Sequence, residues 1–145
     1  LLLWMAQIVV YALHLQRFLP VVLHEPLFVS TAAQAAGALL SAAGLVLFVA
    51  ALVSFGRSWR IGIDTGKPGA LVTGGAFSIS RNPVFLFIDA YFIGTFLICS
   101  SPFFLACAVI AVTGIHWQIL QEERFLEGHY GAAYSAYRAA VRRYI

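Results

Sequence analysis

The chain has 145 residues and a formal net charge of +3; 61% of its residues are hydrophobic and 10% are charged. About a quarter of the residues in an ordinary soluble domain are charged, so this composition excludes that class and indicates an integral membrane protein. The length predicts a single domain over residues 1–145, and the few, scattered basic residues argue against a nucleic-acid partner.

Four apolar segments predict an all-α, polytopic membrane helix bundle with about four transmembrane helices. The first runs from Leu1 to about Leu19 and is the weakest, because polar residues gather toward its end. The second, Ala32 to Phe55, carries no charge and is long enough to cross a hydrocarbon core about 30 Å thick. A third helix is predicted from Pro83 to about Cys99, with the proline in the first turn, where no N–H is needed. After a turn at 100–102, the segment from Phe103 to Leu120 returns.

The distribution of basic residues predicts the orientation of these helices. All lysines and arginines except Arg17 lie either in the polar connection at 56–82 or in the last segment, from Gln121 to Ile145. The loop at 20–30 and the turn at 100–102 hold none. Because cytoplasmic loops of membrane proteins are enriched in lysine and arginine, we expect both polar segments in the cytoplasm, the last one as a cytosolic C-terminal helix.

The third predicted helix begins at a polar sequence, Arg81-Asn82-Pro83. Free backbone N–H groups and the positive end of the helix dipole favour an anion there, such as a carboxylate or a phosphate, and Arg81 could add a charge-assisted contact. The alternative is a membrane-surface arginine followed by a helix-initiating proline. The residues around Arg81 alone do not decide between these two interpretations.

A second polar cluster follows the fourth apolar segment directly. Gln118 and Glu122 lie one helical turn apart and therefore share a face. A carboxylate at the end of a membrane helix could neutralise a cationic ligand. The alternative is a solvated helix in which Glu122 or Glu123 pairs with Arg124 or Arg81.

The remaining polar side chains predict structural rather than chemical roles. Cys99 and Cys107 lie in apolar stretches, and no CxxC, HExxH or histidine-rich tract points to a metal, so no metal site is expected. Asp89 should face the bundle, because an unpaired charge in hydrocarbon is costly. The tail combines aromatic and basic residues, which predicts a helix at the level of the lipid headgroups: Tyr130, Tyr134, Tyr137, Arg138, Arg142 and Arg143.

Two ordered motifs carry a family resemblance. Residues 71–85 read LVTGGAFSISRNPVF, which resembles the LVT-G-Y-x-R-H-P-x-Y signature of the isoprenylcysteine carboxyl methyltransferase and phospholipid methyltransferase superfamily. Residues 122–141 read EERFLEGHYGAAYSAYRAAV, which is similar to the EExxL and FGxxYxxYxxxV tail of that superfamily. Upstream, FGRSWRIG at 55–62 resembles a bacterial branch, so the match covers about residues 48–145.

The resemblance implies a small helical membrane enzyme that binds S-adenosylmethionine without a Rossmann fold, through a cofactor-binding part at about residues 56–145. The site would face the cytoplasm at a bacterial inner membrane. By position, Glu122 would take the amino group of the cofactor, and Arg81 would hold its carboxylate or order the loop. Arg81, Asn82 and Glu122 are the expected catalytic residues. The expected cofactor-binding residues are Leu71, Val72, Phe77, Asn82, Pro83, Val84, Phe85 and Glu122.

Departures from the family pattern bear on the acceptor. Asn82 stands at the position of the usual histidine and cannot titrate near pH 7. Gln118, the expected substrate-binding residue, stands about where the eukaryotic enzymes place an arginine. The expected partners are membrane lipids and a lipid-like or small hydrophobic acceptor that enters from the bilayer. Carboxylate O-methylation is the first expectation, and a phospholipid amine or a thiol is also open.

Two functions of other classes stay open beside methyl transfer. One is an NADPH-dependent membrane reductase of the sterol or steroid type, since such reductases carry a related Arg-His-Pro-x-Tyr region. The other is a non-catalytic lipid-binding membrane protein in which Asn82 marks a decayed site. Binding of the cofactor distinguishes both from the methyltransferase.

Overall fold

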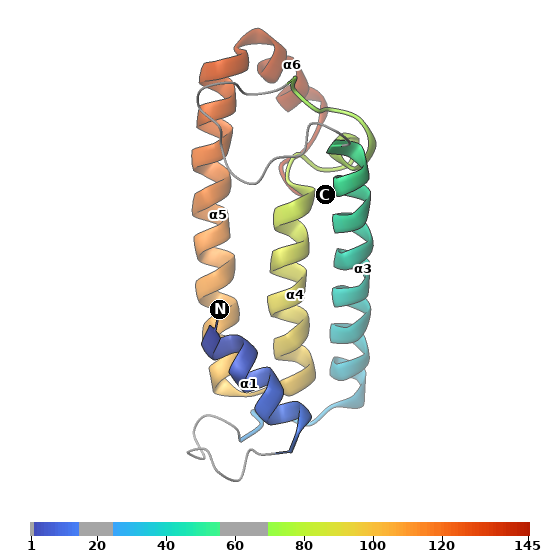
Figure 1. The fold of residues 1–145 in the computed structure, drawn as a ribbon, viewed down its shortest axis with the longest axis vertical. Helices are drawn as coiled ribbons and strands as arrows, with labels where there is room; N and C mark the ends of the chain where they lie inside the picture. The colour runs from blue at the N-terminus through green and yellow to red at the C-terminus, as the bar shows by residue number, and fades with distance from the viewer. Residues whose placement is uncertain (1, 15–24, 56–69) are drawn as a thin grey trace. The chain divides into compact units, whose positions relative to one another are not determined.

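The computed structural model describes residues 2–14, 25–55 and 70–145 (Figure 1). Within these ranges the regular structure consists of five α-helices and one short 3-10 helix, and no strand occurs there. The all-α prediction is thereby confirmed for the described residues. The elements are α1 (Leu2–Ala12), α3 (Thr31–Phe55), η3 (Gly75–Ser78), α4 (Pro83–Cys99), α5 (Pro102–Tyr130) and α6 (Ala132–Ala140).

Two of the described helices, α3 and α5, are long and apolar enough to cross a membrane. The other two apolar helices are shorter, with 11 residues in α1 and 17 in α4. The arrangement with about four membrane-crossing helices therefore remains a prediction. The orientation of the helices also remains a prediction. Three of the basic residues from which it was inferred, Arg57, Arg60 and Lys67, lie outside the described residues.

One helix boundary differs from the prediction. The fourth apolar segment was expected to end at Leu120, but α5 continues without a break to Tyr130. Glutamine, glutamate, arginine and leucine are all good helix formers, so the change from apolar to polar sequence does not end the helix. The break comes at Gly131, whose φ of 53° suits a residue without a side chain. The apolar part of α5 and its charged end thus belong to one helix.

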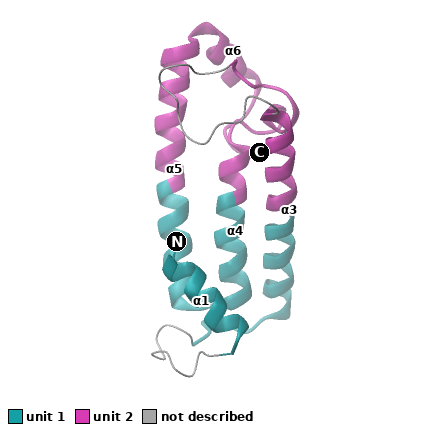
Figure 2. Cartoon of the chain, viewed as in Figure 1, with its two compact units in different colours: residues 1–42, 88–114 teal, residues 43–87, 115–145 magenta. Residues whose placement is uncertain are grey.

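The chain divides into two compact units, and each is described by itself. One comprises residues 1–42 and 88–114 and is called unit 1 here; the other comprises 43–87 and 115–145 and is called unit 2 (Figure 2). In unit 1, the buried ring of Trp4 on α1 lies 4.4 Å from the ring of Phe92 and 4.7 Å from that of Phe104, measured between centroids. Aromatic contacts of this kind attach α1 to α4 and α5 within the unit.

Small residues bring α3 and α4 close together in unit 1. A Cβ atom added to Gly37 would lie 2.5 Å from the carbonyl oxygen of Gly94. A Cβ atom added to Gly94 would lie 2.7 Å from the carbonyl oxygen of Gly37 and would also collide with the Ser41 hydroxyl. Glycines at a helix crossing allow the two backbones to make van der Waals contact, as membrane helices commonly do.

Replacing Gly94 by alanine is expected to lower the free energy of unfolding by roughly 1–3 kcal/mol, because the Gly37 backbone cannot move aside. Gly114→Ala on α5 is the matched control. No atom lies within 4 Å of its added Cβ, so it is expected to be neutral or stabilising by up to about 1 kcal/mol. Denaturant or thermal unfolding in detergent measures both. Equal stability of the two variants would contradict the close crossing.

Unit 2 has its own buried core. It consists of five residues from α3, η3 and α6: Ala51, Ala76, Phe77, Tyr134 and Tyr137. The segment that contains η3 is held against the end of α3, because the Ala76 amide donates a hydrogen bond of 3.0 Å to the Ser54 hydroxyl. Next to it, Gly75 has a φ of 61°, and a side chain there would collide with Ser54. Through this core, the segment before α4 packs against both α3 and α6.

Candidate active site

The turn that leads into α4 is bonded to the C-terminal segment of the chain. The Arg81 amide donates to the carbonyl oxygen of Arg142 at 3.0 Å. The carbonyl oxygen of Arg143 accepts two hydrogen bonds of 3.1 Å, one from the Ser80 hydroxyl and one from the side-chain amide of Asn82. Ser80 also accepts the amide proton of Asn82. Residues 61 to 63 positions apart in the chain therefore fix the start of α4.

Glu123 on α5 is the centre of an ion cluster with two arginines. Its carboxylate lies 3.3 Å from Nη2 of Arg81 and accepts bonds from Nε and Nη2 of Arg143, the shortest of them 2.8 Å. The side chains of Arg81 and Glu123 are each only 8% exposed, whereas that of Arg143 is 33% exposed. The fork of Arg143 on both carboxylate oxygens is the strongest geometry for such a pair.

The electrostatics of this cluster keep Glu123 ionised. Burial by itself would raise the pKa of the Glu123 carboxyl. The hydrogen bonds from Arg143 and the charges of Arg81 and Arg143 outweigh that effect, so the pKa lies below its usual range. The structure thus confirms one of the pairs considered above, Glu123 with Arg81.

Glu122, the neighbour of Glu123 in the chain, has a different environment. It lies in the polar end of α5, beyond the apolar stretch that ends at Leu120, and it is half-buried. Burial raises the pKa of the Glu122 carboxyl, and no cation among the described residues forms an ion pair with it. A partly buried carboxylate without a counter-ion is the kind of group that a cationic ligand would stabilise.

The predicted cofactor-binding residues fall into three groups in the structure. Phe77 belongs to the core of unit 2, and Leu71, Val72 and Val84 are partly buried against that core. Asn82, in the turn before α4, and Pro83, the first residue of α4, are both buried. The Asn82 side chain bonds to the carbonyl of Arg143, a member of the ion cluster. The remaining cofactor-binding residues, Phe85 and Glu122, are half-buried. Gln118, the expected substrate-binding residue, is half-buried as well.

The structure corrects one part of the interpretation of the tail, the placing of all its tyrosines against lipid. Tyr134 is 1% exposed and Tyr137 is 8% exposed, so both belong to the protein core. Arg138 pairs with Glu127 at 3.0 Å, and Arg143 pairs with Glu123. The tyrosines are three positions apart on α6, and this spacing, which places both on one face, was the signal that could have indicated burial.

Sequence reasoning also missed the residues that hold the cluster together. Ser80 and Arg143 had no assigned role in the site, and Glu123 was considered only as one of two carboxylates that could pair. The contacts of Ser80, of the Asn82 side chain and of the Arg81 amide with the C-terminal segment all run to backbone carbonyl groups. A residue pattern carries no signal for an acceptor that every residue type possesses.

Replacing Tyr137 by phenylalanine is expected to lower the free energy of unfolding by roughly 1–2 kcal/mol. Its buried hydroxyl donates a hydrogen bond of 2.7 Å to the carbonyl oxygen of Phe77, which would be left unpaired. Burial, and then the nearby Tyr134, raise the pKa of Tyr137 to about 12, so the donor proton is retained at physiological pH. Thermal unfolding in detergent measures the loss, and an unchanged midpoint would contradict a role for this bond.

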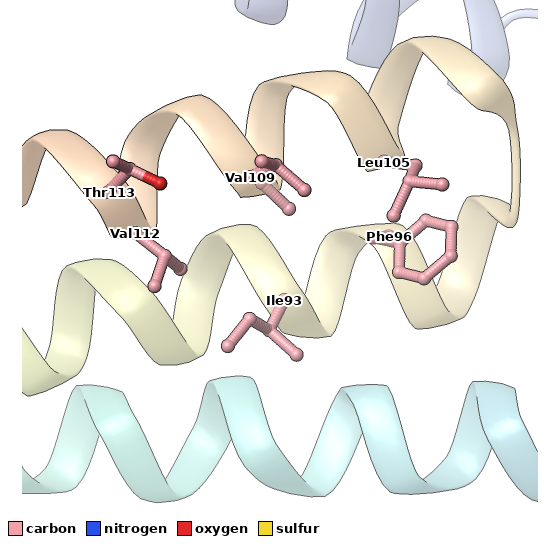
Figure 3. Close-up of a pocket in the computed structure, with 7 residues that line it drawn as sticks. Ile93, Phe96, Leu105, Val109, Val112 and Thr113 are labelled. Carbon is pink, nitrogen blue, oxygen red and sulfur yellow. The ribbon is translucent and has the colours of Figure 1, made fainter.

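A separate apolar cleft lies within unit 1, between α4 and α5 (Figure 3). Its volume is about 300 Å³. None of its lining residues is charged, and none belongs to the predicted cofactor site. They are Ile93, Phe96, Leu105, Ala108, Val109, Val112 and Thr113. A cleft with this lining suits a hydrocarbon chain and has no group that could bind the ionic part of a cofactor.

Comparison with known proteins identifies the family. The family model for phospholipid methyltransferases matches residues 32–133, which is more than half of the chain. The matched region includes the turn before α4, the ion cluster residues Arg81 and Glu123, and Glu122. Searches among curated proteins and among solved structures found no match. The described residues contain no group of three or more histidine, cysteine, aspartate or glutamate side chains that could hold a metal ion. The chain therefore belongs to the phospholipid methyltransferase family, a family of membrane methyltransferases.

Proposed function

We propose that the protein transfers a methyl group from S-adenosylmethionine to a lipid-like or small hydrophobic acceptor at the cytoplasmic face of a membrane. The observation that carries the proposal is the half-buried Glu122 carboxylate, which forms no ion pair among the described residues. It directly precedes the Glu123 cluster in a chain of a methyltransferase family. A bacterial inner membrane and about four membrane-crossing helices are part of the proposal.

The residues present fit the parts of this cofactor. When bound, S-adenosylmethionine supplies a methyl group on a sulfonium, and transfer leaves the bonding electron pair on sulfur. Glu122 would accept hydrogen bonds from the ammonium group, and Arg81 would donate to the carboxylate. Leu71 and Val72, partly exposed beside Phe77, would contact the adenosine.

Asn82 restricts the mechanism. Its side-chain amide donates to the carbonyl oxygen of Arg143, which fixes its orientation. An amide does not titrate near neutral pH, so this position cannot remove a proton from the acceptor. Positioning the nucleophile in line with the methyl group and excluding water would then provide much of the acceleration. An acceptor that is already an anion or a neutral amine meets that requirement.

The apolar cleft of unit 1 and the two long apolar helices support a lipid-like acceptor. Gln118 bears on the class of acceptor, because a neutral amide lacks the charge and the paired donors with which an arginine binds a carboxylate. This consideration, together with the family match, favours a phospholipid amine over the isoprenylcysteine carboxylate that the motif resemblance suggested first.

The test is transfer of labelled methyl from S-adenosylmethionine by the full chain in nanodiscs. Three acceptors are offered: phosphatidylethanolamine, a prenylated cysteine and an alkyl thiol. We expect label in phosphatidylethanolamine. Label in the prenylated cysteine alone would overturn the choice of acceptor but keep the activity. No transfer to any acceptor, together with NADPH-dependent reduction of a sterol, would overturn the proposed function.

A further inference from the structure

Two consecutive residues after α6 contact one face of α5 within unit 2. The Arg143 side chain bonds to Glu123, and the Tyr144 hydroxyl forms a hydrogen bond with Nδ1 of His116. His116 and Glu123 are seven residues apart, so they share a face of the helix and are separated by two turns. One short segment therefore holds both the carboxylate of the ion cluster and this histidine.

The same segment is bonded to the turn before α4. The backbone carbonyl group of Arg143 accepts hydrogen bonds from the side chains of Ser80 and Asn82. The rings of His116 and Tyr144 also stack, with centroids 6.2 Å apart and ring planes inclined by 27°. The imidazole is therefore oriented by a segment that also builds the candidate active site.

His116 lies in the apolar part of α5, four residues before Leu120, and its side chain is exposed. This helix is one of the two that are long and apolar enough to cross a membrane. Tyr144 bonds to Nδ1 of the imidazole, whereas Nε2 has no hydrogen-bond partner among the described residues. An ionisable side chain in a membrane helix is costly and commonly marks a substrate path or a proton relay.

The proposed phospholipid acceptor needs a group that removes a proton. A primary alkylamine is mostly an ammonium ion at neutral pH, as the lysine side chain is, and its nitrogen then has no electron pair with which to attack. Asn82 cannot take this proton. Glu123 is bound to two arginines, and Glu122 is assigned to the cofactor. Imidazole is the side chain that accepts and releases a proton most readily near neutral pH.

The second histidine of unit 2 is placed differently. His129 is also exposed, but it lies in the polar end of α5, six residues beyond Glu123, and its ring stacks on that of Phe125. A lipid acceptor enters from the apolar side of the helix, where His116 lies. His129 therefore serves as a comparison for His116 and has no role in the inference.

We infer that His116 is the base that deprotonates the acceptor amine, and that Tyr144 is the positioning residue that holds its ring. The inference rests on the proposed function. The ammonium N–H bond breaks, its proton moves to Nε2 of His116, and the electron pair stays on the nitrogen. That pair forms the bond to the methyl carbon while the carbon–sulfur bond breaks and leaves its pair on sulfur. The Tyr144 hydroxyl accepts the Nδ1 proton, and the exposed imidazolium releases its additional proton to water.

The test is methyl transfer by the full chain in nanodiscs at a series of pH values, with two matched lipid acceptors. One is phosphatidylethanolamine; the other carries fluorine atoms next to the amine, which is then neutral without a base. His116→Gln and Tyr144→Phe are compared with the wild type and with the control His129→Gln. Melting curves and binding of S-adenosylhomocysteine check the fold of each variant. Glu123, on the same face of α5, stays ionised because its pKa is lowered, so it does not contribute to the profile near neutral pH.

At neutral pH, His116→Gln should lower kcat/KM for phosphatidylethanolamine roughly a hundredfold or more and leave the fluorinated lipid almost unaffected. The loss should shrink as the pH rises and the amine loses its proton unaided. Tyr144→Phe should show the same selectivity with a smaller loss, on the order of tenfold. His129→Gln should match the wild type with both lipids.

Equal losses for the two lipids, or no loss for phosphatidylethanolamine, would overturn the role of His116 and leave the proposed function intact. If His116→Gln does not fold, the ratio between the two lipids in Tyr144→Phe decides. Wild-type transfer only to the fluorinated lipid, or only to a prenylated cysteine or a thiol, would also overturn the inference while keeping the methyltransferase activity. No transfer to any acceptor would overturn the proposed function itself.

Discussion

Replacing Glu123 by alanine is expected to lower the free energy of unfolding by roughly 3 kcal/mol or more. Removing this carboxylate leaves Arg81 buried without an ion-pair partner among the described residues. It also releases the side chain of Arg143, whose backbone carbonyl accepts hydrogen bonds from the turn before α4. Breaking a buried pair from one side is costly because the remaining charge cannot be rehydrated. Denaturant unfolding of the purified chain in detergent measures the difference.

The matched control is Glu127→Ala, which breaks another glutamate–arginine pair on the same helix. Glu127 contacts Arg138 at 3.0 Å, but the two side chains are 47% and 49% exposed. Exposed pairs contribute under about 1 kcal/mol, so this variant should differ little from the wild type. Equal losses in the two glutamate variants would show that the Glu123 cluster has no special role.

The same cluster predicts how stability depends on pH. The pKa of Glu123 is lower in the folded protein than its ordinary value. Its contribution is therefore fully present above the pKa of the unfolded chain and is lost as the pH falls through the folded pKa. Glu123→Ala should lack this part of the acid sensitivity, which unfolding curves at a series of acidic pH values would reveal.

Replacing the adjacent Glu122 by glutamine is expected to have the opposite effects. Its folded pKa is raised by burial, so the ionised form is less stable in the folded protein than in the unfolded chain at neutral pH. The neutral, isosteric glutamine should leave stability unchanged or slightly increased. Binding of S-adenosylhomocysteine should weaken at least tenfold, because the ammonium group of the ligand loses a charged partner.

The Glu122→Gln experiment needs both readouts, a melting curve and a binding isotherm. Wild-type affinity in a stable Glu122→Gln variant would refute the assignment of the ammonium group to this residue. A strong loss of stability would instead show that Glu122 has a structural partner. The account thus expects substitution of Glu123 to lower stability and substitution of its neighbour Glu122 to weaken ligand binding.

The helical boundaries that depend on strong local signals could be predicted from the sequence. The second apolar segment ends at Phe55 as expected, and α4 begins at Pro83 and ends at Cys99. Long apolar runs without charges, a proline in a first turn and a Ser-Ser-Pro sequence are each sufficient without tertiary information. The first helix is a partial exception, since α1 ends at Ala12 and residues 15–19 lie outside the described part.

The arrangement of the site depended on tertiary contacts and could be predicted only in part. The motifs and their spacing identified Arg81 and Glu122 as site residues. For Glu123 they indicated only that it could pair with Arg81 or Arg124. Which of two adjacent carboxylates meets an arginine is set by the rotation of α5, and a one-residue change turns a side chain by about 100°. The role of Arg143 depends on the path of the chain after α6, which has no sequence signature.

The central claim is that this chain binds S-adenosylmethionine and uses it as a methyl donor. The most direct test is calorimetric titration of the full chain in nanodiscs with S-adenosylhomocysteine and, separately, with NADPH. The account predicts saturable binding of S-adenosylhomocysteine and no binding of NADPH. Binding of NADPH without binding of S-adenosylhomocysteine would contradict it.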